Sequence, residues 1–513
     1  MRTSLRPEQT TILGQPDRLF VLFFTEMWER FSFYGMRALL VLFLISSASE
    51  GGWGWSRADA TSLYGWYSML VYFTPLMGGY LADRYLGTRR AVVLGGFIIA
   101  AGHISFFLET VTSFFLGLLL VILGTGLFKP NVSAIVGQLY GPDNETARDG
   151  GYTLFYMGIN AGAFFGIALC GYIGEKISWS LGFGLAGLFM ILGALQFYFG
   201  QHIFGDIGLL PSQGSGPSIG LAAERDDTPA PVVRDRLHAI LVLSFFSIFF
   251  WFAFEQAGGS MTIFAADYTQ RSLEGGWALA FKIVNTMITV IPTAILSWLL
   301  LMMIRIRGRS CMSSHLMLVI ALALIWGVVV WMLAREFSAP QTEVPATWFG
   351  VLNSFFIVLL APLFSRFWIK YWNPSGPVKF AAGLIFLGLG FGVLAYGANG
   401  MEPGANAAQV SMIYLILAYL LHTMGELCLS PVGLSYISKL APKHLLSAIF
   451  GIWFLNAAVA AWIAGATGSY IDDISSAYSM SGFFMIFAVI PTFASLLLLA
   501  ITPWLKKKMH GVQ

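Results

Sequence analysis

The chain has 513 residues, of which 57% are hydrophobic and 11% are charged, and its mean hydropathy is +0.73. A soluble domain carries about 25% charged residues, so this composition excludes an ordinary soluble protein and predicts a polytopic membrane protein. The net charge is only +3, and no basic stripe stands apart from the membrane flanks, which argues against nucleic-acid binding. Three cysteines in or beside apolar segments, Cys170, Cys311 and Cys428, predict neither a disulfide framework nor a metal site.

Apolar stretches of about 20 residues, the length that crosses a bilayer, recur along the whole chain. The first follows a polar N-terminus without a small-residue cleavage site, so we interpret it as a retained helix rather than a signal peptide. The helices expected before a Gly/Pro/Ser-rich stretch cover residues 18–48, 58–83, 90–109, 112–139, 150–174 and 179–201. Those expected after it cover residues 237–266, 277–304, 315–334, 346–371, 377–397, 408–438, 446–469 and 478–504.

Basic residues gather in one set of alternate loops, such as those that hold Arg84, Arg305 and Lys506. The positive-inside rule therefore predicts that both termini are cytoplasmic, which requires an even number of spans. The predicted domains are an N-terminal six-helix bundle (1–204), a cytoplasmic linker (205–236) and a C-terminal six-helix bundle (237–513) with an inserted hairpin at about 277–334. The expected fold class is an all-α membrane protein with two six-helix bundles, an extra two-helix hairpin and about 14 transmembrane helices.

Three ionisable side chains, Glu26, Glu29 and Arg30, interrupt the first apolar segment. Each costs about 2.5–3.5 kcal/mol at the centre of a membrane helix, so they are expected to face water, one another or a substrate. Offsets of three and four residues place Glu26 on the same helical face as Glu29 and Arg30. This face is the predicted working surface of the protein.

Later helices carry Lys129, Glu255 and Glu426 within apolar surroundings. Because an unpaired buried charge is costly, pairing between the two bundles is expected. Lys129 with Glu426 is the natural gating salt bridge, and Arg30 or Arg37 could pair with Glu255. Such pairs would open when a carboxylate is protonated.

Each of these residues could also have a purely structural role. A lone charge can be a satisfied ion pair, and Arg37 and Lys282, near helix ends, can extend to the interface. His103 is expected to be packed, whereas His422, one turn before Glu426, could modulate that acid.

Neutral polar side chains add further candidates for a binding cavity. Tyr34 and Tyr72 carry hydroxyls that need a partner when buried. Asn160 lies among small residues, where a close helix contact explains the glycines and substrate hydrogen bonding is one explanation of the amide.

At these residues the sequence resembles the proton-dependent oligopeptide transporter family of the major facilitator superfamily. Residues 26–35 (EMWERFSFYG) are similar to the family's ExxERFxYYG signature, and residues 155–162 (FYMGINAG) match its FYxxIN motif. Residues 426–433 (ELCLSPVG) are similar to a third signature, and residues 79–84 (GYLADR) resemble the superfamily's loop between helices two and three. The resemblance covers nearly the whole chain.

The resemblance implies a symporter that imports di- and tripeptides with protons by alternating access, without a cofactor, and is not an enzyme. The protein is expected to be a monomer in a bacterial inner membrane, with both termini cytoplasmic. Arg30 and Lys129 would receive the peptide carboxylate, and Glu426 would receive the ammonium. Glu26, Glu29 and Glu255 would couple protons. The remaining implied substrate contacts are Tyr34, Tyr72, Asn160, Trp251, Asn353, Ser430 and Trp453.

The sequence also departs from the family. Phe33 replaces a tyrosine of the first signature, and Gly65 stands where animal relatives have a histidine. The hairpin follows the seventh core helix rather than the sixth. If it has no function in transport, it is expected to be a peripheral appendage that faces lipid. The nearest alternative function is transport of nitrate or another small anion by the same fold. A membrane-embedded enzyme would need a catalytic dyad or metal cluster, and a receptor would not need matched charges in both halves.

Overall fold

The structure is a computed structural model that describes residues 11–140, 145–210, 229–308, 310–405, 410–442 and 445–512. The middle of the expected linker, residues 211–228, lies outside the described residues. Long helices dominate the described part. Twelve segments are long and apolar enough to cross a membrane, in two of which a pair of helices forms one span.

The helices of the first half begin and end close to the expected positions. They are α1 (Asp17–Ile45), α2 (Arg57–Leu81), α3 (Thr88–Phe107), α4 (Val111–Gln138), α5 (Glu145–Phe165), α6 (Gly171–Lys176) and α7 (Trp179–Gly200). A π-helical turn at Gly166–Cys170 joins α5 to α6 within one span. α1 and α2 have 29 and 25 residues and so have the length of a span, although they are not among the twelve apolar segments.

The second half contains the remaining helices. They are α8 (Ala230–Phe254), α9 (Ser260–Asp267), α10 (Gly275–Arg307), α11 (Met312–Ser338), α12 (Val351–Lys370), α13 (Gly376–Gly397), α14 (Ile413–Leu440), α15 (Leu446–Gly468) and α16 (Ile471–Lys508). A 3-10 turn, η5 (Glu255–Gly258), lies between α8 and α9. The all-α membrane fold and the fourteen expected segments are therefore confirmed.

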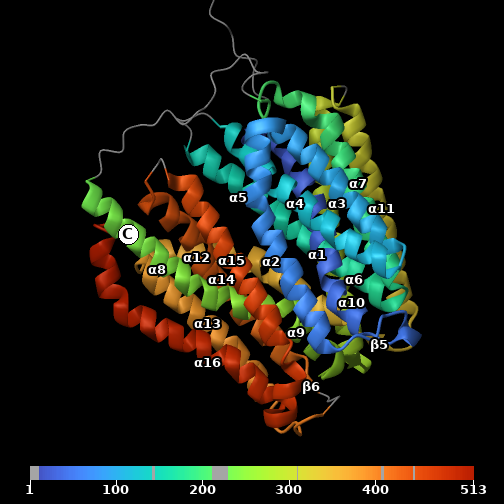
Figure 1. The fold of residues 1–513 in the computed structure, drawn as a ribbon. Helices are drawn as coiled ribbons and strands as arrows, with labels where there is room; N and C mark the ends of the chain where they lie inside the picture. The colour runs from blue at the N-terminus through green and yellow to red at the C-terminus, as the bar shows by residue number, and fades with distance from the viewer. Residues whose placement is uncertain are drawn as a thin grey trace, which may run out of the picture. The chain divides into compact units, whose positions relative to one another are not determined.

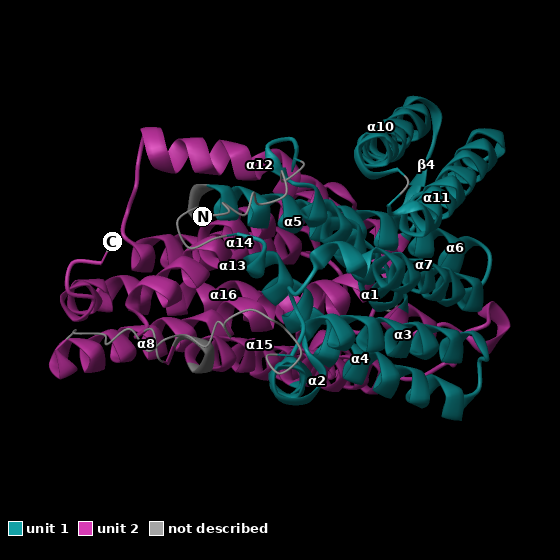
Figure 2. Ribbon diagram, turned by 90° about the horizontal axis from the view of Figure 1, so that it is seen from above, with its two compact units in different colours: residues 1–39, 74–216, 271–345 teal, residues 40–73, 217–270, 346–513 magenta. Residues whose placement is uncertain are grey.

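The chain forms two compact units, coloured separately in Figure 2. Unit 1 contains residues 1–39, 74–216 and 271–345, and unit 2 contains residues 40–73, 217–270 and 346–513. The boundaries fall inside α1 and α2, so each of these helices contributes one part to each unit.

In unit 1, α3 packs against α4 and α7, and α11 packs on the other side of α7 (Figure 1). The hairpin of α10 and α11 is held to the first-half helices by polar contacts. Tyr172 Oη donates to Glu336 Oε1 at 2.5 Å, and Ser314 Oγ donates to the Gln196 carbonyl at 2.9 Å. An outward row of α10, which includes Ile283, Met287 and Ile291, remains exposed, as expected of a lipid-facing side.

This placement differs from the expected domain division, which assigned the hairpin to the C-terminal bundle. Order along the chain suggested that assignment, but the buried polar contacts with α6 and α7 attach the hairpin to unit 1 instead. The residues that flank it form an antiparallel pair, β4 (Ser272–Leu273) with β5 (Thr342–Glu343), also in unit 1.

In unit 2, α13 packs between α14 and α16, and α8 packs against α15 and α16. Short strands β3 (Thr269–Gln270) and β6 (Val410–Ser411) pair in parallel beside these helices. Another short pair, β1 (Thr11–Ile12) with β2 (Gln15–Pro16), precedes α1 in unit 1.

Candidate functional site

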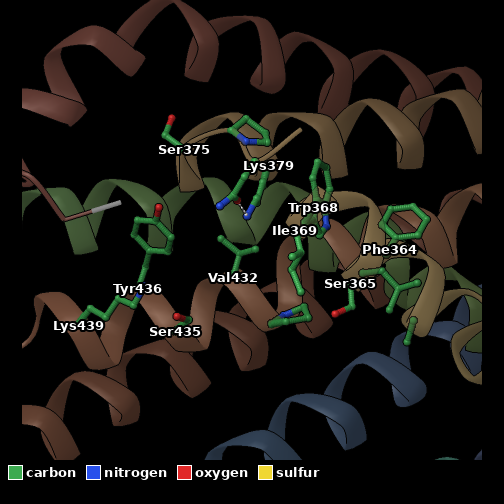
Figure 3. Close-up of a pocket in the computed structure, with 15 residues that line it drawn as sticks. Phe364, Ser365, Trp368, Ile369, Ser375, Lys379, Val432, Ser435, Tyr436 and Lys439 are labelled. Carbon is green, nitrogen blue, oxygen red and sulfur yellow. Dashed lines mark hydrogen bonds between the residues drawn. The ribbon is translucent and has the colours of Figure 1, made fainter. Parts of the chain in front are cut away.

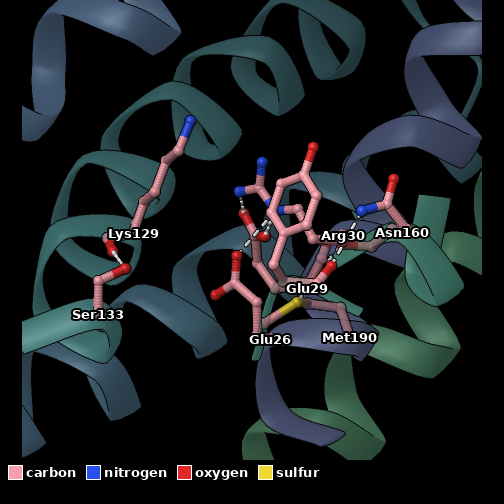
Figure 4. Close-up of polar contacts among 9 residues, drawn as sticks. Glu26, Glu29, Arg30, Lys129, Ser133, Asn160 and Met190 are labelled. Carbon is pink, nitrogen blue, oxygen red and sulfur yellow. Dashed lines mark hydrogen bonds and ion pairs between the residues drawn. The ribbon is translucent and has the colours of Figure 1, made fainter. Parts of the chain in front are cut away.

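The charged face of α1 forms a buried ion-pair cluster in unit 1 (Figure 4). The Arg30 guanidinium pairs with Glu29 through Nε and through Nη2, which lies 2.5 Å from Oε1. Its Nε also lies 3.3 Å from Glu26 Oε1. Glu29 is 0% exposed and Arg30 is 3% exposed, so the three charges are removed from solvent and pair with one another, as the cost of isolated buried charges requires. Glu26 Oε2 is buried and has no hydrogen-bond partner among the described residues.

Helix α5 supports this cluster through a close approach to α1. A Cβ on Gly162 would lie 2.2 Å from the Met27 carbonyl oxygen and 2.8 Å from Arg30 Cβ. Only glycine allows the two backbones to come this close. The close helix contact expected for the glycines beside Asn160 is therefore present. The Asn160 amide donates its Nδ2 to the Tyr156 carbonyl at 3.0 Å.

Lys129 extends from α4 toward the same region of unit 1 and is labelled in Figure 4. It is close enough to Glu26 for electrostatic attraction. The following residue, Pro130, lies inside α4 and lacks the amide that would bond back to the preceding turn. Ser133 Oγ donates to the Lys129 carbonyl at 3.3 Å. On α1, the Arg37 guanidinium lies 6.0 Å from the centroid of the Tyr34 ring.

In unit 2, Glu255 lies at the end of α8, where the helix tightens into η5. Its carboxylate is 3% exposed and accepts two hydroxyl hydrogen bonds, from Tyr64 Oη to Oε2 and from Tyr72 Oη to Oε1, each at 3.1 Å. One turn earlier, the Trp251 ring packs against Phe250 and Phe254. α2 and α8 thus position one acid between two phenols.

Glu426, on α14 of unit 2, accepts a hydrogen bond from Asn353 Nδ2 at 2.9 Å. The same Nδ2 lies 3.2 Å from Thr423 Oγ1. One turn after Glu426, the buried Ser430 Oγ has no hydrogen-bond partner among the described residues. Trp453 packs against Phe380 with ring centroids 6.2 Å apart. The acid therefore lies beside an amide and a hydroxyl that can contact a small polar molecule.

The predicted site residues fall into both units. Unit 1 contains Glu26, Glu29, Arg30, Tyr34, Arg37, Lys129 and Asn160. Unit 2 contains Tyr72, Trp251, Glu255, Asn353, Glu426, Ser430 and Trp453. Lys129 with Glu426, and Arg37 with Glu255, belong to different units, so these pairings stay predictions. Arg30 is engaged by Glu26 and Glu29.

Sequence reasoning did not select Tyr64 or Thr423 as partners of the site residues, and it did not predict the ion pairs of Arg57. Tyr64 lies eight residues before Tyr72, a spacing that returns to the same helical face and could have indicated it. Arg57, at the start of α2, pairs with Asp267 at 2.5 Å and with Asp472 at 2.9 Å, all in unit 2. These partners lie far apart in sequence, so no local pattern revealed them.

The two histidines considered from the sequence are both packed in the interior. His103 is fully buried against Phe106, and neither ring nitrogen has a hydrogen-bond partner among the described residues. The His422 ring lies 4.5 Å from the centroid of Phe391. A packing role explains both rings.

Comparison with known proteins agrees with this arrangement. A family model described as the POT family matches residues 89–214 and 325–485. The "Peptide transporter YePEPT" of Yersinia enterocolitica is 32% identical over 92% of this chain and 91% of its own length. A "Di-/tripeptide transporter" of Lactococcus lactis subsp. cremoris is 30% identical over 99% of this chain and all of its own.

Solved structures agree as well. A crystal structure of a peptide transporter POT in complex with sulfate has a TM-score of 0.75 and 30% identity, and 98% of each chain is covered. A mutant of a peptide transporter POT in complex with alafosfalin has a TM-score of 0.76 and 30% identity, with the same coverage. The family model and the relatives at 30% identity or more, which align with nearly the whole chain, show that this chain belongs to the POT family of transporters.

Proposed function

We propose that this protein is a proton-coupled symporter that imports di- and tripeptides by alternating access. The observation that carries the proposal is the distribution of charge. Unit 1 gathers Arg30 and Lys129 around buried acids, and unit 2 presents Glu426 beside the Asn353 amide. A short peptide is a zwitterion, and a protein that binds it needs a cationic group and an anionic group. The named relatives that transport di- and tripeptides support the same substrate class.

In this mechanism the peptide carboxylate binds Arg30 and Lys129, and the peptide ammonium binds Glu426. Tyr34, Asn160 and Asn353 supply hydrogen bonds, and the indoles Trp251 and Trp453 bound the side-chain pockets. Binding at both poles favours closure around the substrate, because the peptide supplies a partner of opposite charge to each pole.

Protons act as co-substrate through Glu26, Glu29 and Glu255, and no cofactor takes part. Arg30 is shared between Glu26 and Glu29, so a proton on either acid changes how the guanidinium is held. Protonation of Glu255 removes the negative charge to which Tyr64 and Tyr72 donate. Each event weakens one set of contacts and so couples proton binding to a change of conformation.

The test is uptake of labelled dialanine by proteoliposomes with an acidic exterior. We expect accumulation by the wild type, and none above equilibrium by Glu26→Gln or Glu29→Gln, while counterflow exchange persists at a reduced rate. Glu402→Gln, an exposed acid outside the candidate site, is the control and should accumulate peptide normally. Undiminished gradient-driven accumulation in both site variants would contradict the proposed coupling.

Transport of nitrate by the same fold would not need the acid Glu426. Unlabelled dipeptides should therefore compete with labelled dialanine, whereas nitrate should not. Competition by nitrate alone would favour the anion transporter.

We also place the working protein in a bacterial inner membrane as a monomer, with both termini cytoplasmic. Accessibility of a C-terminal tag in intact cells and in inverted vesicles tests the sidedness, and the mass of the purified particle tests the monomer.

A further inference from the structure

A pocket of about 450 Å³ lies within unit 2, where α12, α13 and α14 meet (Figure 3). Lys379 from the start of α13 and Lys439 from the end of α14 both line it. None of the lining residues that the structure describes is acidic. On α14 the lining begins at Leu427, one residue after Glu426. The lining includes none of the candidate peptide-site residues.

The charged groups that line the pocket are both cations, and the other polar groups are neutral. Lys379 Nζ donates to Asn373 Oδ1 at 2.7 Å and lies 5.1 Å from the centroid of the Trp368 ring. Ser375 Oγ is a buried side-chain oxygen that has no hydrogen-bond partner among the described residues. Such an oxygen is costly unless a ligand or water satisfies it.

The N-terminus of α13 adds a further positive contribution. Ser375 is its N-cap residue, and the side chain makes no capping hydrogen bond to the helix. The Gly376 amide donates to Tyr436 Oη at 2.8 Å, so one of the first amides is already satisfied within the pocket wall. The aligned peptide dipoles of this 22-residue helix place partial positive charge at this end.

Two lysines therefore line one cavity that has no acid in its described lining. Lys439 is near enough to Lys379 for the two ammonium groups to repel each other. A bound anion would relieve this repulsion and would accept hydrogen bonds from both lysines and from Ser375. A phosphate group has the charge and the number of acceptor oxygens to do so.

The surroundings indicate where that phosphate comes from. The end of α12 beside the pocket exposes Ile369 (83%), Tyr371 (70%) and Trp372 (51%). Exposed aromatic residues at the end of a membrane helix are typical of the level of the lipid headgroups. Basic pockets between membrane helices at the cytoplasmic side bind anionic headgroups. The positive-inside rule assigns the connection between α12 and α13, with Lys370 and Lys379 beside it, to that side.

We propose that this pocket binds the phosphate headgroup of an anionic phospholipid, with Lys379 and Lys439 as counter-ions and Ser375 Oγ as a hydrogen-bond donor. The apolar side of the pocket, at Phe364 and Ile369, is suited to the glycerol and the first acyl carbons. This site is independent of the proposed peptide transport.

Native mass spectrometry of the purified full-length protein with phosphatidylglycerol tests the site. We expect the wild type to retain this lipid in preference to phosphatidylcholine. The double variant Lys379→Gln/Lys439→Gln should bind phosphatidylglycerol about tenfold more weakly, a loss of about 1.4 kcal/mol. The double variant Lys506→Gln/Lys507→Gln removes the same charge from exposed residues at the end of α16 and should bind as the wild type does.

Two outcomes would overturn the proposal. Equal retention by the pocket variant and the control variant would show that these lysines do not hold the lipid. Tight binding of inorganic phosphate to lipid-free protein, with no added affinity for phosphatidylglycerol, would show that the ligand is a soluble anion. The variant Lys379→Arg/Lys439→Arg guards against a folding defect, because it keeps both charges and should restore lipid binding.

Discussion

At the scale of single residues, the most constrained side chain is Arg30. Its guanidinium engages Glu29 through two nitrogens and reaches Glu26 as well. Such an arrangement depends on the planar fork of arginine, which an ammonium group does not reproduce. The position therefore requires arginine and not only a positive charge.

The variant Arg30→Lys tests this requirement. We expect gradient-driven dialanine uptake to fall by about tenfold or more, because lysine can hold one of the two acids but not both in the same geometry. Arg366→Lys, at an exposed position on α12, is the matched control and should transport normally. Wild-type uptake by Arg30→Lys would show that charge alone is sufficient.

The two phenols that donate to Glu255 offer a second residue-level test. A hydrogen bond to a charged group contributes about 1.5–3 kcal/mol, and the carboxylate is almost fully buried. Tyr64→Phe and Tyr72→Phe should each lower the thermal unfolding midpoint in detergent, and the double variant should lower it further. Tyr198→Phe, which removes a hydroxyl from a half-exposed ring on α7, should not. An unchanged midpoint in the double variant would mean that these bonds contribute nothing to stability.

At the scale of helices, α2 and α15 approach each other within unit 2 at Gly65 and Gly465. A Cβ on Gly65 would lie 2.7 Å from Gly465 Cα, and a Cβ on Gly465 would lie 2.4 Å from Gly65 Cα. Backbone atoms cannot move aside as a flexible side chain can. This contact leaves no space at Gly65 for a larger side chain such as an imidazole.

Gly65→Ala should therefore be destabilising, by about 1–3 kcal/mol, the usual cost of overpacking. Gly327→Ala on α11 is the control, because nothing lies within 4 Å of a Cβ built there. In that position alanine should be neutral or stabilise the helix. Thermal unfolding of both variants measures the difference, and equal midpoints would contradict the close contact.

The residues that flank the hairpin are linked by charge as well as by the pairing of β4 with β5. Glu343 pairs with Lys176 at 2.5 Å and with Arg271 at 3.0 Å. Partial burial raises the pKa of Glu343, but the Lys176 hydrogen bond and the Arg271 charge outweigh burial and hold that pKa below its usual range. A carboxylate with a lowered pKa stabilises the folded state above its unfolded pKa of about 4.3, and this contribution is lost as the pH falls through the folded-state value.

Hydrogen exchange of the β4 and β5 amides tests this charge effect. At pH 7, Glu343→Gln should speed their exchange several-fold, because the surface-exposed pair contributes up to about 1 kcal/mol. Below the folded-state pKa of Glu343 the variant and the wild type should exchange alike, since both side chains are then neutral. A difference that persists at low pH would assign the effect to packing rather than to charge.

Helix positions were largely predictable because span length is a simple consequence of bilayer thickness. The expected start of the last helix at residue 478 coincides with an interruption in α16, where Ser479 adopts a positive φ of 65°. Hydropathy did not reveal that helical structure extends back through Asp472 and Asp473, because a polar first turn resembles a loop. The hairpin's attachment to unit 1 was not predictable, because it depends on which buried surfaces fit together.

The charged residues of the site were identified because their cost in an apolar helix makes them conspicuous. Their partners were not. Tyr64 and Thr423 are ordinary residues in apolar sequence. Packing between helices brings the Tyr64 hydroxyl to Glu255 and the Thr423 hydroxyl to Asn353. The sequence therefore identifies the charged groups that are costly to bury, and the fold determines which neutral groups form hydrogen bonds with them.

At the scale of the whole molecule, the two poles of the proposed site belong to different units. Arg30 and Lys129 lie in unit 1, and Glu426 lies in unit 2. In the proposed mechanism, a substrate with both charges has a partner for each charge, whereas a substrate with one charge lacks one of these partners. The proposed function therefore predicts that the substrate carboxylate depends on Arg30 and Lys129, and that the substrate ammonium depends on Glu426.

This requirement is tested by removing the ammonium of the substrate and the carboxylate of Glu426, first separately and then together. For the wild type, N-acetyl-dialanine should compete with labelled dialanine about 10- to 100-fold more weakly than dialanine itself, because one charge-assisted contact of about 1.5–3 kcal/mol is lost. In Glu426→Gln this discrimination should nearly disappear, since the partner of the ammonium is already gone. The same variant should still discriminate against dialanine amide, whose missing carboxylate concerns unit 1. If Glu426→Gln distinguished the acetylated peptide as strongly as the wild type does, the ammonium would have to bind elsewhere, because a lost partner cannot contribute twice.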